Sequence, residues 1–391
     1  MAQLQRAMVG RDPAEAHRAS TPLELFFDLT FVVAVAQCSV LLHHGLVDGE
    51  AGRAISHYPL MFFGIWWAWM NFTWFASAYD VDDVPYRLAV FVQMTGVLIL
   101  AAGIPRVMES DDYVVVVAGY VVMRLALVGL WLRAARSHPE GRACAMRYAI
   151  GVSVLQVFWV LRLFLPDSAG TVSFLLLVAA ELAVPWWAEQ AGRTSWHPGH
   201  IAERYGLFTI IVLGESILSA TAGVQAALDG HVALRELLPV IVGGLLVVFS
   251  LWWMYFDLPT EAMAARARAA MDDSGNMAFL WGYGHYFVFG AAAAVGAGLA
   301  AQVDHVTHHT ELGSVATGFA LTVPVAVYVL MLWLIHRPAK DPGPLRDLVV
   351  PVGLALILLA SWSPSPVLFA GVVCAAIVAL HVTFSGRWSA E

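Results

Sequence analysis

Long apolar stretches separated by short polar segments are the dominant pattern along this chain. A helix needs about 20 apolar residues to cross a bilayer. A scan for such stretches predicts twelve spans, at residues 22–45, 58–80, 87–105, 113–133, 148–165, 171–190, 203–226, 235–257, 277–301, 315–335, 347–361 and 365–384. The last two are short and are joined by a Pro-containing turn, so they could instead form a hairpin that crosses only in part. We therefore expect an all-α, polytopic transmembrane helix bundle of about twelve spans.

The distribution of basic residues predicts the orientation of these spans. With the N-terminus in the cytoplasm, sixteen Lys and Arg residues fall on the cytoplasmic side, three on the outer side and two within spans. Cytoplasmic loops are enriched in Lys and Arg, so the asymmetry favours an N-in, C-in topology. Residues 1–20 and 385–391 are then cytoplasmic tails, and the Ala-rich stretch near 258–277 is a connecting helix on the same side.

Two halves of the chain, residues 21–190 and 191–384, resemble each other weakly. Each half opens its first span near an acid, Glu24 or Glu203, and closes its second span in an aromatic-rich stretch that ends at Asp80 or Asp257. The pattern is compatible with a parallel repeat of six plus six helices. Aromatic residues are also common at membrane interfaces, and this alone could produce the resemblance.

Composition sets the class of the protein. Hydrophobic residues make up 60% of the chain and charged residues 13%, which is outside the range of soluble globular domains. The expected surroundings are a lipid bilayer that the chain crosses many times. Nucleic acid is not an expected partner, and the sequence does not predict the oligomeric state or the identity of a small-molecule or ion substrate.

An acidic pair in the first span is the leading candidate for chemistry. Glu24 and Asp28 are four residues apart, so on a helix both carboxylates project from one face about 6 Å apart along the axis. Two acids in a poorly hydrated place favour binding of a proton or a cation. The alternative is that both lie at the water interface, where the helix dipole stabilises acids.

A second acidic segment opens the seventh predicted span. Glu203 and Glu215 share one broad helix face with His200, and Glu215 lies about 18 Å deeper than Glu203. A carboxylate at that depth should face protein or water and could carry a proton. It could equally be a protonated acid that hydrogen-bonds to a neighbouring helix.

One arginine lies near the middle of a span. Arg124 is expected to form an intramembrane salt bridge with Glu24, Asp28, Glu181 or Glu215, and the sequence does not decide which.

Histidines are weaker candidates. His285 could relay protons or bind a metal, although a lone helix histidine is more often held by a hydrogen bond. His200 and Glu203 follow His197 at a spacing compatible with a weak metal site, but a Pro-Gly pair separates the two histidines. The secondary candidates are the other polar residues in or near the spans: His200, Arg204, Asp80, Asp257 and Glu181. No metal is predicted with these residues, and no cofactor beyond a proton or cation.

Three segments resemble a known family. These are LELFFDLTFVVAVAQ, AERYGLFTIIVLGES and SLWWMYFD, which begin at Leu23, Ala202 and Ser250. Together they are similar to the bacterial low temperature requirement A family, and the similarity spans most of the chain. The resemblance implies a multi-span inner-membrane protein, named for a growth requirement in the cold, with Glu24, Asp28 and the later acids as its core. It implies no substrate.

Three functions remain open at this point. We favour a proton- or ion-coupled transporter in which Glu215 binds the coupling ion, Glu24 and Asp28 form a relay and Arg124 is the counter-ion. The second is an intramembrane enzyme, perhaps using a metal, that acts on a lipid or an apolar metabolite. The third is a membrane scaffold or sensor without chemistry. The chain has no Walker loop, GxSxG or HExxH motif, so ATP-driven transport by this chain alone is not expected.

Overall fold

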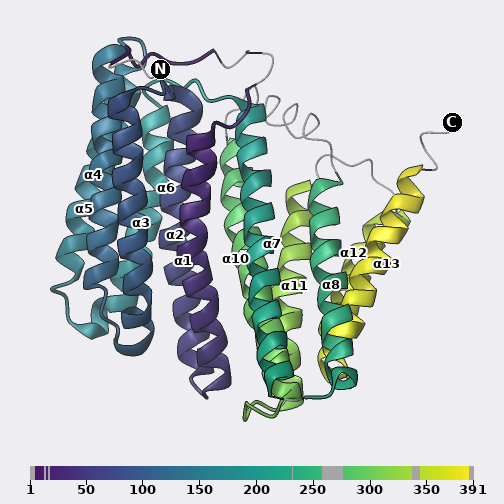
Figure 1. Cartoon of the computed structure of the whole chain (residues 1–391). Coiled ribbons are helices and arrows are strands. Elements are labelled where there is room, and N and C mark those ends of the chain that lie inside the picture. The colour runs from purple at the N-terminus through teal and green to yellow at the C-terminus, as the bar shows by residue number, and fades with distance from the viewer. Residues whose placement is uncertain are drawn as a thin grey trace. The chain divides into compact units, whose positions relative to one another are not determined.

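The computed structural model describes residues 5–12, 15, 18–230, 232–257, 276–336 and 344–386. Throughout these residues the regular elements are helices, which confirms the all-α prediction (Figure 1). They comprise α1 (Pro22–Val47), α2 (Ala51–Tyr79), α3 (Val84–Ser110), α4 (Val114–Ser137), α5 (Arg142–Arg162), α6 (Gly170–Glu189), α7 (Pro198–Asp229), α8 (Leu234–Phe256), α10 (Asn276–Val306), α11 (Ser314–His336), α12 (Pro344–Leu359) and α13 (Pro366–Gly386), with short 3₁₀ helices at Asp167–Ala169 and Ala360–Trp362.

Ten of these helices are long and apolar enough to cross a membrane, judged by length and composition. The other two are α2, which is 29 residues long but rich in Trp, Tyr and small polar residues, and α12, which has 16 residues. The twelve predicted spans each overlap one α-helix. The N-in, C-in orientation stays a prediction, and the predicted connecting helix near 258–277 lies outside the described residues up to position 275.

The chain divides into two compact units. The first contains residues 1–37 and 63–204, and the second contains residues 38–62 and 205–391. The division passes through helices α1, α2 and α7. The repeat of two six-helix halves remains a prediction.

Within the first unit, α3, α4, α5 and α6 follow one another as neighbours, each packed on the next. Glycines allow α3 and α4 to approach closely: a Cβ atom on Gly119 would lie 2.5 Å from the carbonyl oxygen of Gly96. Small residues at such crossings are typical of membrane helices, because packing rather than water exclusion holds them together.

Glycines also allow close helix packing in the second unit. A Cβ atom on Gly371 of α13 would lie 2.5 Å from the carbonyl oxygen of Gly243 in α8, and one on Gly298 of α10 would lie 2.5 Å from the carbonyl oxygen of Ala320 in α11. Helix pairs α8–α13 and α10–α11 therefore pack through backbone contact.

Candidate functional site

The candidate site lies in the first unit and begins at the start of α1. Thr21 and Glu24 form a reciprocal capping box: the Thr21 hydroxyl accepts from the Glu24 amide at 3.3 Å, and Glu24 Oε2 accepts from the Thr21 amide at 2.8 Å. Pro22 occupies the first helical position, where its missing N–H costs nothing. Glu24 is thus held at a helix N-terminus, as the alternative interpretation expected, yet its side chain is only 1% exposed.

One turn further along α1, Asp28 is completely buried and paired. Arg204 of α7 grips it with two nitrogens, Nη2 to Oδ1 at 2.5 Å and Nε to Oδ2 at 3.0 Å. The indole of Trp69 in α2 donates a third hydrogen bond at 2.7 Å. A two-pronged contact of this kind fixes both position and orientation, so Asp28 and Arg204 lock α1 to the start of α7.

The start of α7 brings an imidazole and a guanidinium to Glu24. The His197 ring caps the helix by accepting from the His200 amide at 3.1 Å, and Pro198 begins it. His200 Nε2 and Arg204 Nη1 each lie 3.2 Å from Glu24 Oε1. The two residues are four apart in α7, and this spacing presents both to one carboxylate.

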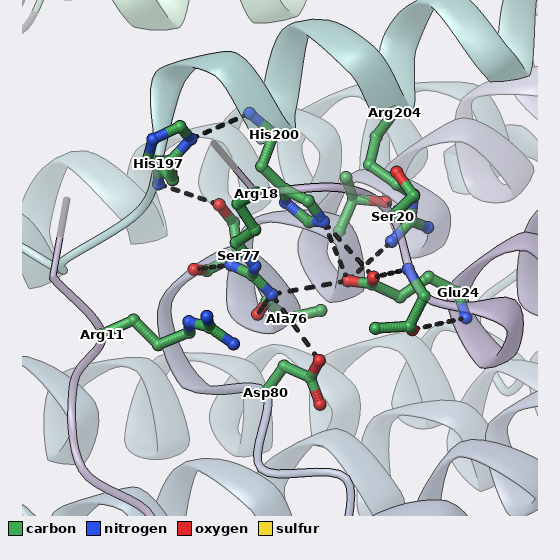
Figure 2. Close-up of polar contacts among 12 residues, drawn as sticks. Arg11, Arg18, Ser20, Glu24, Ala76, Ser77, Asp80, His197, His200 and Arg204 are labelled. Carbon is green, nitrogen blue, oxygen red and sulfur yellow. Dashed lines mark hydrogen bonds and ion pairs between the residues drawn. The ribbon is translucent and has the colours of Figure 1, made fainter. Parts of the chain in front are cut away.

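Arg18 adds a second guanidinium from the segment before α1 (Figure 2). It donates to the carbonyl oxygens of Ser77 and Ala76 in α2. Its Nη2 lies 3.8 Å from Glu24 Oε1 and 3.7 Å from Asp80 Oδ2. The guanidinium therefore bridges the α1 carboxylate to the acid that follows α2.

We call these six residues the charge network: Arg18, Glu24, Asp28, Asp80, His200 and Arg204. Each is less than 9% exposed. Because α2 repeats every 3.6 residues, Trp69, Thr73, Ser77 and Asp80 lie along one of its faces and form the wall of the network. The Thr73 hydroxyl lies 3.4 Å from Arg204 Nη2.

The segment before α1 packs on the first unit rather than extending away from it. Met8 is fully buried, the Arg6 amide donates to Asp83 at 2.8 Å, and the Arg11 amide donates to the Ala78 carbonyl at 3.0 Å. His197 Nε2 contacts the Glu15 carbonyl oxygen at 2.8 Å. These contacts anchor the segment that inserts Arg18, so part of the predicted cytoplasmic tail belongs to the site.

Replacing Arg18 by glutamine should lower the stability of the protein by about 2 kcal/mol, because two buried carbonyls lose a charged donor and two carboxylates lose a cation. Thermal unfolding in detergent, followed by tryptophan fluorescence, measures this. Arg11→Gln is the control, since Arg11 pairs with Glu15 at a partly exposed site and should contribute about 0.5 kcal/mol or less. Equal losses in the two variants would show that Arg18 is not part of the network.

The network carries an uneven charge. Three carboxylates face two guanidiniums and one histidine, so one negative charge remains when His200 is neutral and every acid is ionised. Burial, together with the charge of Glu24, raises the pKa of Asp80 to about 6. Uptake of one proton near neutral pH neutralises the network.

Several buried polar atoms around the network make no hydrogen bond within the described part of the chain. They are His200 Nδ1, Arg204 Nη1, Glu24 Oε1, Ser20 Oγ and Tyr86 Oη. Fully bonded buried groups are the rule, and exceptions concentrate where a group changes its state. This arrangement can bind and release a proton, with spare donors and acceptors ready to change partners.

The structure places Arg124 elsewhere in the first unit. Its Nη2 lies 3.1 Å from Glu181 Oε2, so Glu181 is the partner among the four acids that the sequence left open. Trp67 and Trp159 also donate to Glu181, at 2.8 and 3.1 Å. The role of counter-ion to Glu24 and Asp28, which we predicted for Arg124, falls to Arg204 and Arg18.

The two acids of the second segment belong to different units. Glu203 is partly exposed, and its Oε1 accepts from the Ser20 amide at 3.2 Å, beside the charge network. Glu215 lies in the second unit, 5% exposed; Ser219 donates to its Oε1 at 2.7 Å, and its Oε2 has no hydrogen-bond partner within the described residues. Its predicted role in ion binding stays a prediction.

The remaining candidates lie in the second unit. His285 is fully buried, with Nδ1 2.8 Å from the Trp281 carbonyl oxygen and Nε2 3.2 Å from the Tyr255 hydroxyl, as the hydrogen-bonded alternative expected. Asp257 pairs with His381 at 2.8 Å. In the described ranges no three His, Cys, Asp or Glu side chains gather as a metal site requires. The weak metal hypothesis for His200 and Glu203 has no structural support, since His200 faces Glu24.

Sequence reasoning missed three contributors to the site: Arg18, Trp69 and Thr73. Two signals could have found them. The run Thr-Pro-x-Glu at residues 21–24 marks a capped helix start and so brings the preceding arginine close to Glu24. Polar or hydrogen-bonding residues at 69, 73, 77 and 80 of an aromatic helix mark one polar face.

Comparison with known proteins gives the family. The model of the bacterial low temperature requirement A protein family matches residues 19–382, nearly the whole chain. The chain belongs to the low temperature requirement A family. Its membership confirms the resemblance of the three sequence segments, and the matched range includes every acid of the charge network.

Relatives of this low temperature requirement A protein fall into two groups. One is the uncharacterized protein RA0937 of Rhizobium meliloti (strain 1021), 26% identical over 345 residues, which cover 85% of this chain and 81% of the relative. The other is the threonine/homoserine exporter RhtA: the Escherichia coli (strain K12) protein is 32% identical over 146 residues, or 36% of this chain and 45% of the exporter. The Salmonella typhimurium (strain LT2) exporter is 30% identical over 149 residues. No solved structure matches the chain.

Proposed function

We propose that this protein is a proton-coupled transporter of the bacterial plasma membrane and that the charge network is its proton-binding site. The observation that carries the proposal is the odd charge of the network. Three buried carboxylates share two guanidiniums, and Asp80 has a pKa of about 6. A buried site that changes by one charge near neutral pH is what proton coupling requires.

The proposed cycle turns on Arg18. With Asp80 ionised, Arg18 is held between Asp80 and Glu24 and the segment before α1 is tied to the end of α2. Protonation of Asp80 removes one of the two ionic partners of Arg18, which then pairs with Glu24 alone. Because the Arg18 contacts join the N-terminal segment to α1 and α2, the loss frees these elements to shift, which is how a proton would bias two conformations.

Similarity to exporters supports transport over catalysis. A third of the chain is similar to a threonine/homoserine exporter, a protein named for moving small polar solutes out of the cell. We infer a small polar solute for this protein too, with the network supplying the coupling proton and not the solute contacts. Arg204 and Asp28 then act as the fixed part of the site, because their two-pronged pair holds α1 and α7 together.

Proteoliposomes test the proposal. Purified protein is reconstituted with a trapped pH-sensitive dye, and gradients of L-threonine and L-homoserine serve as the first probes. The wild type should move protons with the solute, and Glu24→Gln should lower this proton flux at least tenfold, because Arg18, His200 and Arg204 lose their shared carboxylate.

The matched control is Glu236→Gln, which removes an exposed carboxylate 3.7 Å from its neighbour Arg235 and should leave the flux unchanged. Solute flux in Glu24→Gln with the rate and pH dependence of the wild type would contradict the proposal. Solute flux without proton movement in the wild type would contradict it as well.

A further inference from the structure

A second polar cluster lies inside the α3–α6 helices of the first unit, built from residues that the charge network does not use. Its centre is the pair of Arg124 and Glu181, 2% and 1% exposed, near the middle of α4 and α6. Charged residues at this depth are costly, so they mark sites where a polar ligand or an ion is handled.

The packing of α3 on α4 places Gln93 at the level of Arg124. A Cβ atom on Gly103 would meet Val115 and Val116, and one on Gly96 would meet Met123 and Gly119. The two helices are antiparallel, so each step back along α3 is a step forward along α4. Extending this register by one turn from Gly96 brings Gln93 opposite Arg124.

The packing of α5 on α4 brings Gln156 to the same level. The rings of Trp131 and Tyr148 stack at 4.2 Å, and those of Tyr120 and Trp159 meet edge to face at 6.4 Å. Both pairs obey one antiparallel register. One turn from Tyr120, that register places Arg124 at the level of Gln156 and its neighbour Leu155 along the helix axis.

We call Gln93, Arg124, Gln156 and Glu181 the polar layer. Gln93 and Gln156 are 3% and 7% exposed. Within the described residues, Gln93 Nε2, both amide atoms of Gln156, and Nε and Nη1 of Arg124 make no hydrogen bond. Buried amide and guanidinium groups are nearly always bonded, so four unused donor nitrogens in one layer require a shared acceptor.

Glu181 cannot be that acceptor for all of them. Its two oxygens already accept from Trp67, Trp159 and Arg124. Arg124 donates to Glu181 and to the Tyr120 hydroxyl through the same nitrogen, Nη2, which lies 2.6 Å from that hydroxyl. The guanidinium also lies over the Tyr120 ring, 4.8 Å from its centroid. The unused donors outnumber the one unused acceptor, Gln156 Oε1, so the layer favours a ligand that accepts.

We infer that the polar layer is a binding site for the carboxylate group of a small organic acid, with Arg124, Gln93 and Gln156 as its donors. A carboxylate offers about four lone-pair sites in one plane, and arginine binds it more strongly than a neutral acceptor. The pair of Arg124 and Glu181 is neutral, so the carboxylate enters with one proton, which keeps the mid-membrane site uncharged. This site uses none of the charge-network residues.

Equilibrium binding of radiolabelled propionate to the purified full-length protein in detergent tests this inference without any transport assay. Binding should be saturable, displaced by unlabelled propionate, unaffected by equal propionamide, and at least fivefold tighter at pH 6 than at pH 7.5. Gln93→Leu and Gln156→Leu should each weaken it about tenfold, since each removes one hydrogen bond to the bound acid.

The double variant Arg124→Gln with Glu181→Gln should abolish binding, and because both charges of the pair are removed together, neither partner is left as an unpaired buried charge. Gln302→Leu is the matched control: it removes a buried amide in the second unit, bonded to the Thr317 carbonyl at 2.7 Å, and should bind propionate like the wild type. Thermal unfolding of each variant checks that it is folded.

The inference is overturned if propionate shows no saturable binding at pH 6, if propionamide displaces it equally, or if the folded double variant binds with wild-type affinity. The first of these results would mean that the layer holds water alone. Loss of proton flux in Glu24→Gln proteoliposomes leaves the inference intact, because the two sites share no residue and the binding assay involves no flux.

Discussion

Replacing Arg204 by glutamine is expected to destabilise the protein by about 3 to 5 kcal/mol, the cost typical of breaking a buried ion pair. Arg204 is completely buried and serves two acids: it holds Asp28 with two nitrogens and lies 3.2 Å from Glu24. Its loss leaves Asp28 with the Trp69 indole, and Glu24 with the Thr21 amide, His200 and the more distant Arg18. The first unit should therefore unfold at a clearly lower temperature in detergent.

Three further variants separate charge from shape. Arg204→Lys keeps the charge but loses the two-pronged contact and should fall between the wild type and Arg204→Gln. Arg204→Gln combined with Asp28→Asn removes one unpaired carboxylate and should recover part of the loss. Arg87→Gln breaks a surface pair with Asp82, in which the side chains are 44% and 47% exposed, and should cost far less stability than Arg204→Gln.

Tryptophan fluorescence during thermal unfolding reports the result, because Trp69 donates directly to Asp28. A loss in Arg204→Gln no larger than that of the Arg87 control would mean that Asp28 and Glu24 do not depend on Arg204. A double variant as unstable as Arg204→Gln alone would show that unpaired charge is not the cause.

The helical class of the fold could be predicted because each span carries its own signal. Twenty apolar residues must form a helix in lipid whatever surrounds them, since the backbone has no other way to satisfy its hydrogen bonds. The helix α2 shows the limit of that signal: Trp66, Trp67 and Trp69 make it aromatic and less apolar by composition, yet all three are buried. Helix pairing depends on small residues such as Gly96 and Gly119, which occur throughout the chain and do not identify their partners.

The site could be predicted in part. Glu24 and Asp28 could be identified because an acid within an apolar membrane helix is costly to bury and is therefore rarely present without a function. Among their partners, His200 and Arg204 were secondary candidates, and Arg18 was not a candidate. Arg18 lies in a polar segment whose fold depends on contacts with Ala76 and Ser77, far along the chain, and no local pattern contains that information. Arg204 directly follows Glu203 in the sequence, so the motif does not show that the partner of Arg204 is Asp28 in another helix.

The stability of the wild type should fall as pH rises from about 4 to about 7, relative to the variant Asp80→Asn. The ordinary pKa of this carboxyl is 3.8, and burial beside Glu24 raises it to about 6 in the folded protein. Between these values the folded state holds a proton that the unfolded chain has released. At 1.36 kcal/mol for each pKa unit, the whole difference is about 3 kcal/mol.

The sign follows from proton counting. Stability rises with pH where the unfolded state binds more protons, and here the folded state binds more, so stability falls. Of the contribution that Asp80 makes to the free energy of unfolding, about 1 kcal/mol is lost by pH 4.5 and nearly all by pH 7.5. The wild type should therefore be about 2 kcal/mol less stable at pH 7.5 than at pH 4.5, relative to Asp80→Asn. Asp80→Asn cannot ionise and lacks this component. Denaturant titrations of both proteins at pH 4.5 and 7.5 give the difference directly.

Asp82 provides the control, since its pKa is displaced in the opposite direction. The hydrogen bonds from Arg87 hold the pKa of Asp82 below its ordinary value of 3.8, so its contribution is present above that value and is lost only at lower pH. Asp82→Asn should therefore change stability equally at pH 4.5 and 7.5. Glu24→Gln removes the neighbouring charge that helps to raise the pKa of Asp80, so it should shrink the wild-type slope. Identical slopes in the wild type and Asp80→Asn would mean that Asp80 is not the group that takes up the proton.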